Sequence, residues 1–501
     1  MQKESNFDPP VENLRSSVGR GATAIAASQG VQVACQMVSV VVLSRLLSPE
    51  DFGLVAMCAP VIAFLGMLQN FGLVQATIQK KDLLASEVNF LFWINVGISI
   101  VLAAGMILTS PLIADFYGDQ RIGPLLAALS ATIVISGLGA QHSALLNRRM
   151  AFGTIAMLSV TGAVCALVVS IAWAMVNPSY WALFGGTFCA ACASTALTWY
   201  FSRWRPSRPA RAPGMRSLLR FGAGLTGFNL TNFFARNLDN ILIGKVWGSA
   251  QLGFYDRAYK LLLFPLQQVS NPLSRVMIPA LSRMLDEPDR YRHAYLRVLK
   301  LSLLLILPGV AWATASASEL ILVLLGPQWI ESASIFTALG FAGLMQPLNN
   351  PAGWLFISQG RSTHYMIWGF VTAAFAICAF AIGIWWAALG VAIAYACSEY
   401  LKTVPLWLFI SRTGPVKALH ILKSAGPFIL AGHLAAATLF ILNDNITLPP
   451  LVTLGCGLVI SYLVTILALL PFSAGRQTFM DVLAIAKDLV GTGKLSRDSL
   501  I

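Results

Sequence analysis

Long apolar runs separated by short polar loops dominate the chain. A helix needs about 20 mostly apolar residues to cross a bilayer, and about fourteen runs of this kind follow one another. The pattern therefore predicts an all-α polytopic membrane protein. The first six spans are expected near 21–43, 52–74, 88–110, 122–142, 152–175 and 179–201. The next six are expected near 221–244, 252–280, 299–317, 332–356, 364–384 and 387–410, and the last two near 424–442 and 450–471.

Polar side chains follow one face of three of these spans when residues are placed 100° apart on a helix. Lipid cannot satisfy such a stripe, so it must face another helix or line a wet cavity. The first span contributes Gln29, Gln32 and Gln36. The seventh contributes Asn229, Asn232, Arg236, Asp239 and Asn240, and the eighth contributes Asp256, Arg257, Lys260 and Arg275.

The charges on these stripes are expensive, since one charged side chain at the bilayer centre costs roughly 2.5–3.5 kcal/mol. One interpretation is an ion pair between helices, or between Arg236 and Asp239. However, the four cations outnumber the two carboxylates, and an anionic substrate would supply the missing charge. The planar donor fork of arginine suits phosphate well. The predicted binding residues for an anionic head group are Arg236, Asn240, Arg257, Lys260, Arg275, Gln29, Gln32, Gln36, Asn229 and Asn232.

A second kind of charged position lies in the twelfth span, where Glu399 and Lys402 are one helical turn apart. They can pair with each other. Alternatively, Glu399 can bind a coupling proton or sodium ion. Asp239 and Glu399 are therefore the candidates for coupling-ion residues.

The chain contains an internal repeat. A shift of 200 residues aligns Gln29 with Asn229, Gln36 with Arg236 and Gly53 with Gly253. Because six spans separate the repeats, both face the same way, which implies a pseudo-twofold axis along the membrane normal and two bundles that rock around a central site. The predicted parts are a cytoplasmic N-terminus (1–20), an N-lobe (21–201), a basic linker (202–220), a C-lobe (221–410), two further spans (411–475) and a cytoplasmic amphipathic tail (476–501).

The distribution of positive charge sets the orientation. With the N-terminus inside, most of the 34 Lys and Arg residues fall in inside segments, and the outside loops hold only Arg45, Arg121 and Lys245. Both termini are therefore expected in the cytoplasm. This distribution also explains the net charge of +13 without a nucleic-acid partner.

Composition and motifs exclude several function classes. Only 11% of the residues are charged, whereas soluble proteins have about 25%. Cys189 and Cys192 have redox spacing but lie inside an expected span, and no metal motif occurs. The segment GTGKLS (491–496) lacks the upstream glycine of a phosphate-binding loop. The sequence thus predicts no metal, no cofactor and no enzyme activity.

Four segments carry a family resemblance. LSRLLSPEDFGLVAM (43–57), NLDNILIGKVWGSAQLGFYDRAYKLLLFP (237–265), RVMIPALSRM (275–284) and LGPQWIESASIF (325–336) resemble segments of bacterial polysaccharide flippases. These belong to the polysaccharide transporter branch of the multidrug/oligosaccharidyl-lipid/polysaccharide exporter superfamily. The likeness is strongest to the colanic-acid and succinoglycan exporter types.

The resemblance implies two six-helix lobes in a V around a central cavity, in the bacterial inner membrane. It implies movement of undecaprenyl-diphosphate-linked repeat units from the cytoplasmic to the periplasmic leaflet, with a polysaccharide polymerase and a chain-length regulator as candidate partners. Two alternatives remain. A cation-coupled drug exporter of the same superfamily would prefer an acidic or apolar pocket, and a membrane polysaccharide polymerase would need a large outer loop.

Overall fold

The computed structural model describes residues 14–70, 73–80, 83–208 and 215–492, with side chains left out at 14–20, 22, 70, 76, 79, 215–236 and 485–492. All regular structure in these ranges is helical. The chain divides into two compact units, residues 1–253 and 254–501. The sequence places the boundary between the lobes in the linker at 202–220, and the division found here falls further along the chain.

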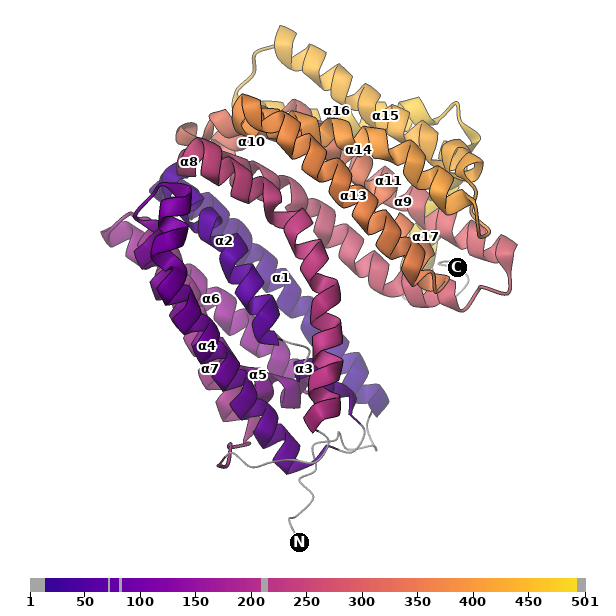
Figure 1. The fold of residues 1–501 in the computed structure, drawn as a ribbon. Helices are drawn as coiled ribbons and strands as arrows, with labels where there is room; N and C mark the ends of the chain where they lie inside the picture. The colour runs from indigo at the N-terminus through magenta and orange to yellow at the C-terminus, as the bar shows by residue number, and fades with distance from the viewer. Residues whose placement is uncertain (1–13, 71–72, 81–82, 209–214, 493–501) are drawn as a thin grey trace. The chain divides into compact units, whose positions relative to one another are not determined.

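Unit 1 is a bundle of long helices that lie side by side (Figure 1). Within it α4 packs on α5, α6 packs on α7 and α1, and α5 also packs on α7. Its helices are α1 (Leu14–Leu46), α2 (Pro49–Asn70), α3 (Leu73–Gln79), α4 (Ala85–Tyr117), α5 (Ile122–Arg148), α6 (Phe152–Val176) and α7 (Tyr180–Ser202), followed by the first part of α8 (Met215–Ser282).

The segment α8 contains the seventh and eighth expected spans as two helices that meet at Gly248, where φ is 82° and ψ is −176°. This φ is easy for glycine and costly for other residues. Just beyond this kink α8 crosses the start of α2. A Cβ on Gly53 would lie 1.7 Å from the carbonyl oxygen of Ser249, and one on Gly253 would lie 2.0 Å from that of Pro49. The 200-residue shift converts the contact between Gly53 and Ser249 into the contact between Gly253 and Pro49. This equivalence is expected where two repeats cross at the same surface.

Unit 2 surrounds α9 with the later helices. Its last span is fixed to α9 by two hydrogen bonds to backbone carbonyls, from Ser461 Oγ to Pro308 at 2.7 Å and from Tyr462 Oη to Leu305 at 2.9 Å. Its elements are α9 (Pro288–Ala315), α10 (Ala317–Leu324), η2 (Pro327–Trp329), α11 (Glu331–Asn349), α12 (Ala352–Ser358), α13 (Ser362–Gly383), η3 (Ile384–Trp386), α14 (Ala387–Ser411), α15 (Ala418–Asn445), α16 (Pro450–Leu469) and α17 (Ser473–Thr492).

The start of the basic linker and the last helix of the chain are each held by specific contacts. The start of the basic linker is bound to α4, since Asn89 Nδ2 donates to the Arg208 carbonyl at 2.8 Å and Trp93 Nε1 donates to that of Ser207 at 2.7 Å. At the other end of the chain α17 packs on α9, α15 and α16. An ion pair of 3.1 Å between Arg297 and Asp481 joins α17 to α9.

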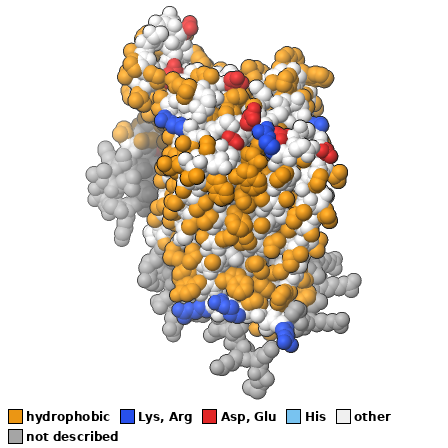
Figure 2. All heavy atoms as spheres, turned by 90° about the vertical axis from the view of Figure 1, so that its left-hand side faces the viewer, with side chains coloured by type: hydrophobic (Ala, Val, Ile, Leu, Met, Phe, Trp, Pro, Cys, Tyr) orange, Lys and Arg blue, Asp and Glu red, His pale blue; other side chains and the backbone are white. Residues whose placement is uncertain are grey.

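The expected spans fall on helices. Among the described residues ten segments are long and apolar enough to cross a membrane, and one of them, Ser362–Ser411, covers the eleventh and twelfth expected spans together. The tenth is shorter than expected, because α11 ends at Asn349 and a separate α12 follows. On the face drawn in Figure 2 hydrophobic side chains form a broad band, and charged side chains gather at its two ends.

Candidate functional site

The charged stripe of the eighth span lies on α8, in unit 2. Lys260 Nζ is 2.8 Å from Asp256 Oδ1, one helical turn away, and Arg257 Nε is 3.9 Å from Asp256 Oδ2. The Asp256 side chain is 6% exposed and that of Arg257 15%, whereas that of Lys260 is 56% exposed. One buried carboxylate therefore holds one half-buried and one accessible cation.

The same helix carries a third cation, Arg275, whose side chain is exposed. Arg257, Lys260, Gln268, Asn271 and Arg275 follow one another at intervals of three, four or eight residues, so they share one face of α8. Three cations and one carboxylate give the described side chains of this stripe a net charge of +2. Lys260 and Arg275 are the two exposed cations among them.

Three tyrosines connect this stripe with the interior of unit 2. The rings of Tyr255 and Tyr259 are stacked 5.9 Å apart, and Tyr259 meets Tyr395 of α14 edge-on at 6.4 Å. The hydroxyl of Tyr395 accepts a hydrogen bond of 3.3 Å from Gln346. This row of aromatic and polar groups leads from α8 to α14, where Glu399 lies one helical turn beyond Tyr395.

Glu399 forms an ion pair with Lys402 in the structure. Their Oε1 and Nζ atoms are 2.5 Å apart, and the two residues are 3% and 9% exposed. Thr403 Oγ1 donates to the Glu399 carbonyl at 2.7 Å, and Asn349 Nδ2 donates to Thr403 Oγ1 at 2.9 Å. The role of Glu399 in ion coupling stays a prediction.

The other predicted site residues lie on the helices of unit 1. Asp239 is 6% exposed, and its Oδ1 accepts a hydrogen bond of 2.8 Å from the Asn240 backbone. Gln29 and Gln36 are exposed on α1 and Gln32 is half-buried. The side chains of Asn229, Asn232 and Arg236 lie outside the described part of the chain, so the proposed pairing of Arg236 with Asp239 stays a prediction.

Unit 1 also contains a polar network that the sequence did not indicate. Lys80 Nζ is 2.5 Å from Glu87 Oε1, and Glu87 is 1% exposed. Arg148 is 8% exposed and donates to the carbonyls of Thr77 at 2.9 Å and Lys80 at 2.5 Å. From sequence, Lys80 and Arg148 count only as loop charges that set orientation. A basic residue at a helix end gives no signal that it turns inward to bind carbonyls.

The loops at the opposite end of unit 1 are held by charged groups outside the expected spans. Arg121 Nη2 is 2.8 Å from Asp119 Oδ2, and its Nη1 is 3.4 Å from Glu50 Oε2. The hydrogen bond from the Arg121 side chain holds the pKa of Asp119 below its ordinary value, and Asp119 in turn raises the pKa of Arg121. Asp51 accepts a 2.9 Å hydrogen bond from the Tyr180 backbone, so the segment SPEDFG ties α2 to the start of α7.

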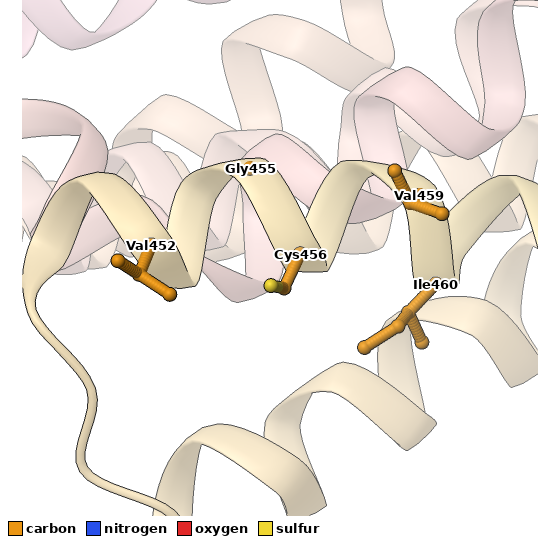
Figure 3. Close-up of a pocket in the computed structure, with 5 residues that line it drawn as sticks. All are labelled: Val452, Gly455, Cys456, Val459 and Ile460. Atoms are coloured by element: carbon orange, nitrogen blue, oxygen red, sulfur yellow. The ribbon is translucent and has the colours of Figure 1, made fainter.

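A hollow of about 470 Å³ lies on α16, far in sequence from the charged stripe. Val452, Gly455, Cys456, Val459 and Ile460 line it, and all of its lining surface is apolar (Figure 3). Such a surface gives no specificity for a charged head group. Among the described residues no cluster of three or more His, Cys, Asp or Glu side chains could hold a metal, and Cys189 and Cys192 are free thiols.

The family model for polysaccharide biosynthesis proteins matches residues 42–334, which is more than half of the chain. The chain belongs to the polysaccharide biosynthesis protein family. Curated relatives include the lipopolysaccharide biosynthesis protein WzxC of Escherichia coli (strain K12), 25% identical over 70% of this chain and 71% of the relative. The succinoglycan biosynthesis transport protein ExoT of Rhizobium meliloti (strain 1021) is 27% identical over 63% of each chain.

Solved structures show the fold. The lipid II flippase MurJ in an inward closed conformation matches with a TM-score of 0.71 at 14% identity, over 92% of this chain and 99% of that one. An inward-facing multidrug resistance transporter of the MATE family, from the MOP superfamily, matches with a TM-score of 0.60 at 13% identity over 76% and 95%. The predicted all-α polytopic fold and the resemblance to polysaccharide flippases are thus confirmed. This member of the polysaccharide biosynthesis family is a multi-pass membrane protein of transporter type.

Proposed function

We propose that this protein translocates undecaprenyl-diphosphate-linked oligosaccharide repeat units from the cytoplasmic to the periplasmic leaflet of the bacterial inner membrane, with both termini in the cytoplasm. The observation that carries the proposal is the surplus of two positive charges on the α8 stripe, where Lys260 and Arg275 are accessible. A diphosphate head group supplies the compensating charge. A polysaccharide polymerase and a chain-length regulator would act on the product.

In the proposed mechanism the diphosphate competes with Asp256 for Lys260. The accessible ammonium can turn from the carboxylate to a phosphate oxygen, while Arg257 remains beside Asp256 as its half-buried partner. The head group is thereby held without leaving a carboxylate unpaired in a low-dielectric interior. Alternating access of the two repeats would then expose the bound head group to the other leaflet.

The test is performed in cells that lack the gene and are complemented with variants. Lys260→Ala and Arg257→Ala should each reduce export at least tenfold and cause the lipid-linked unit to accumulate in the cytoplasmic leaflet. The matched control is Arg283→Ala, which removes an exposed cation just after the end of α8. Normal export by both stripe variants at normal membrane levels contradicts the proposal.

The competing function is drug export coupled to a cation. Its substrates are cationic, so the net charge of +2 on the α8 stripe would repel them. A drug exporter should leave lipid-linked glycans unchanged when deleted, and should lower drug susceptibility when overproduced. Glycan analysis of the deletion strain therefore separates the two functions.

A further inference from the structure

Glu399 and Lys402 form an ion pair one helical turn apart, and both residues are buried. α14 runs from Ala387 to Ser411, so Glu399 lies near its midpoint and near the middle of the bilayer if α14 crosses it. At that depth a carboxylate needs a permanent partner or must become neutral. Lys402 supplies the partner at 2.5 Å.

The polar groups around the pair are neutral and bind one another. Asn349 donates to Thr403, Thr403 donates to the Glu399 carbonyl, and Gln346 donates to Tyr395. A sodium ion would need several oxygen ligands around Glu399. The ammonium of Lys402 already contacts Oε1 of the carboxylate and supplies its counter-charge.

We propose that Lys402 is a tethered counter-cation, which takes the place of a coupling ion at Glu399 and makes this site independent of soluble cations. The inference deepens the proposed function and rests on it for its transport readout. A coupling ion must enter and leave the protein in every cycle, whereas a lysine on the next helical turn cannot leave. Of the two candidates for coupling-ion residues, Asp239 is then the one that remains.

Several other titratable groups lie near the pair. Tyr395 is on α14 itself, and Tyr255 and Tyr259 are on α8. On α11 the neutral Asn349 donates a hydrogen bond from its Nδ2 to the Glu399 carbonyl. His433 of α15 accepts a 2.6 Å hydrogen bond from Tyr400, while α13 carries His364 and Tyr365 in its first turn, next to Phe409 and Phe356. Asp256 of α8 lies between Tyr255 and Tyr259 but keeps Lys260 and Arg257 beside it. Glu399 is the carboxylate that loses its partner with Lys402, so a newly acquired cation or pH dependence would come from Glu399.

The experiment measures the thermal unfolding midpoint of the purified full-length protein in sodium chloride and in choline chloride of equal ionic strength, over a range of pH. The wild type should show the same midpoint in both salts. Lys402→Met should lower the midpoint and make it rise with added sodium or with decreasing pH, because Glu399 must then acquire a cation or a proton. Lys402→Arg keeps the charge and should stay insensitive to sodium.

The double variant Glu399→Gln/Lys402→Met removes both charges and should lose the sodium and pH dependence of Lys402→Met. A sodium-specific rise in the wild-type midpoint overturns the inference, as does a Lys402→Met variant that responds like the double variant. Flipping of the lipid-linked unit in vesicles, with sodium replaced by choline, gives the second readout. Failure of the wild type to flip under all conditions refutes the proposed function, while the unfolding data still decide whether Lys402 replaces a soluble cation.

Discussion

The close crossing of α2 and α8 leads us to expect that any residue larger than glycine at Gly53 destabilises the protein. In Gly53→Ala the new Cβ would lie 1.7 Å from the Ser249 oxygen and 2.5 Å from its carbonyl carbon. Both are backbone atoms, so no side chain can rotate away and the helices themselves must separate. Overpacking of this kind costs about 1–3 kcal/mol. The gain in helix propensity from glycine to alanine, about 1 kcal/mol, offsets part of it, which leaves a net loss of up to about 2 kcal/mol.

The assay is thermal unfolding of the purified protein in one detergent. Gly66→Ala is the matched control, because Gly66 lies on the same helix and a Cβ there has no atom within 4 Å. Gly253→Ala should resemble Gly53→Ala, since its Cβ would lie 2.0 Å from the Pro49 oxygen. The double variant should lose less than the sum of the two, because one separation of the helices relieves both clashes. If Gly53→Ala unfolds at the same temperature as Gly66→Ala, the close crossing does not exist.

Three further predictions concern contacts within one unit. The lowered pKa of Asp119 means that its contact with Arg121 stabilises the protein above the ordinary carboxyl pKa of about 4 and is lost as the pH falls through the lowered value. Wild-type unfolding midpoints should thus fall more steeply than those of Asp119→Asn on acidification below that range. Arg148→Met should lower stability by about 1.5–3 kcal/mol through the loss of charged hydrogen bonds to two carbonyls, measured as a lower unfolding midpoint. Ser461→Ala removes the bond to Pro308 and should cost only about 0.6 kcal/mol, detectable by the same measurement but without loss of membrane insertion.

The helices could be predicted from sequence because hydrophobicity over about 20 residues is a strong signal. The positions of the bends were harder to predict from the sequence. The seventh and eighth spans are expected to be separated near 245–251, and in the structure two helices meet within this segment at Gly248, the one residue of α8 with non-helical φ and ψ. The tenth span breaks after Asn349 because Pro351 has no N–H to continue the helical hydrogen bonds, although Asn350 and Pro351 both keep right-handed helical φ and ψ.

The candidate site was predictable only in part. The stripe on α8 followed from periodicity, since a polar face at 3.6-residue spacing is visible in a single sequence. The row from Tyr259 through Tyr395 to Glu399 was not, because its members come from helices more than 100 residues apart and aromatic residues are common in membrane spans. The inward orientation of Arg148 could not be predicted either, because its hydrogen-bond partners are backbone carbonyls, which the residue type does not reveal.

The repeat shows which features belong to the shared architecture and which to the site. Gly53 and Gly253 make equivalent close contacts, so the two copies keep the same backbone geometry at this crossing. A few residues later the copies differ in chemistry. Under the 200-residue shift Asp256, Arg257 and Lys260 correspond to Ala56, Met57 and Pro60. Ala56 and Met57 are each 1% exposed, so their positions in the first copy serve packing. The charges are therefore not required by the helix crossing itself, and a role in binding an anionic head group gives a reason for their presence in the second copy alone.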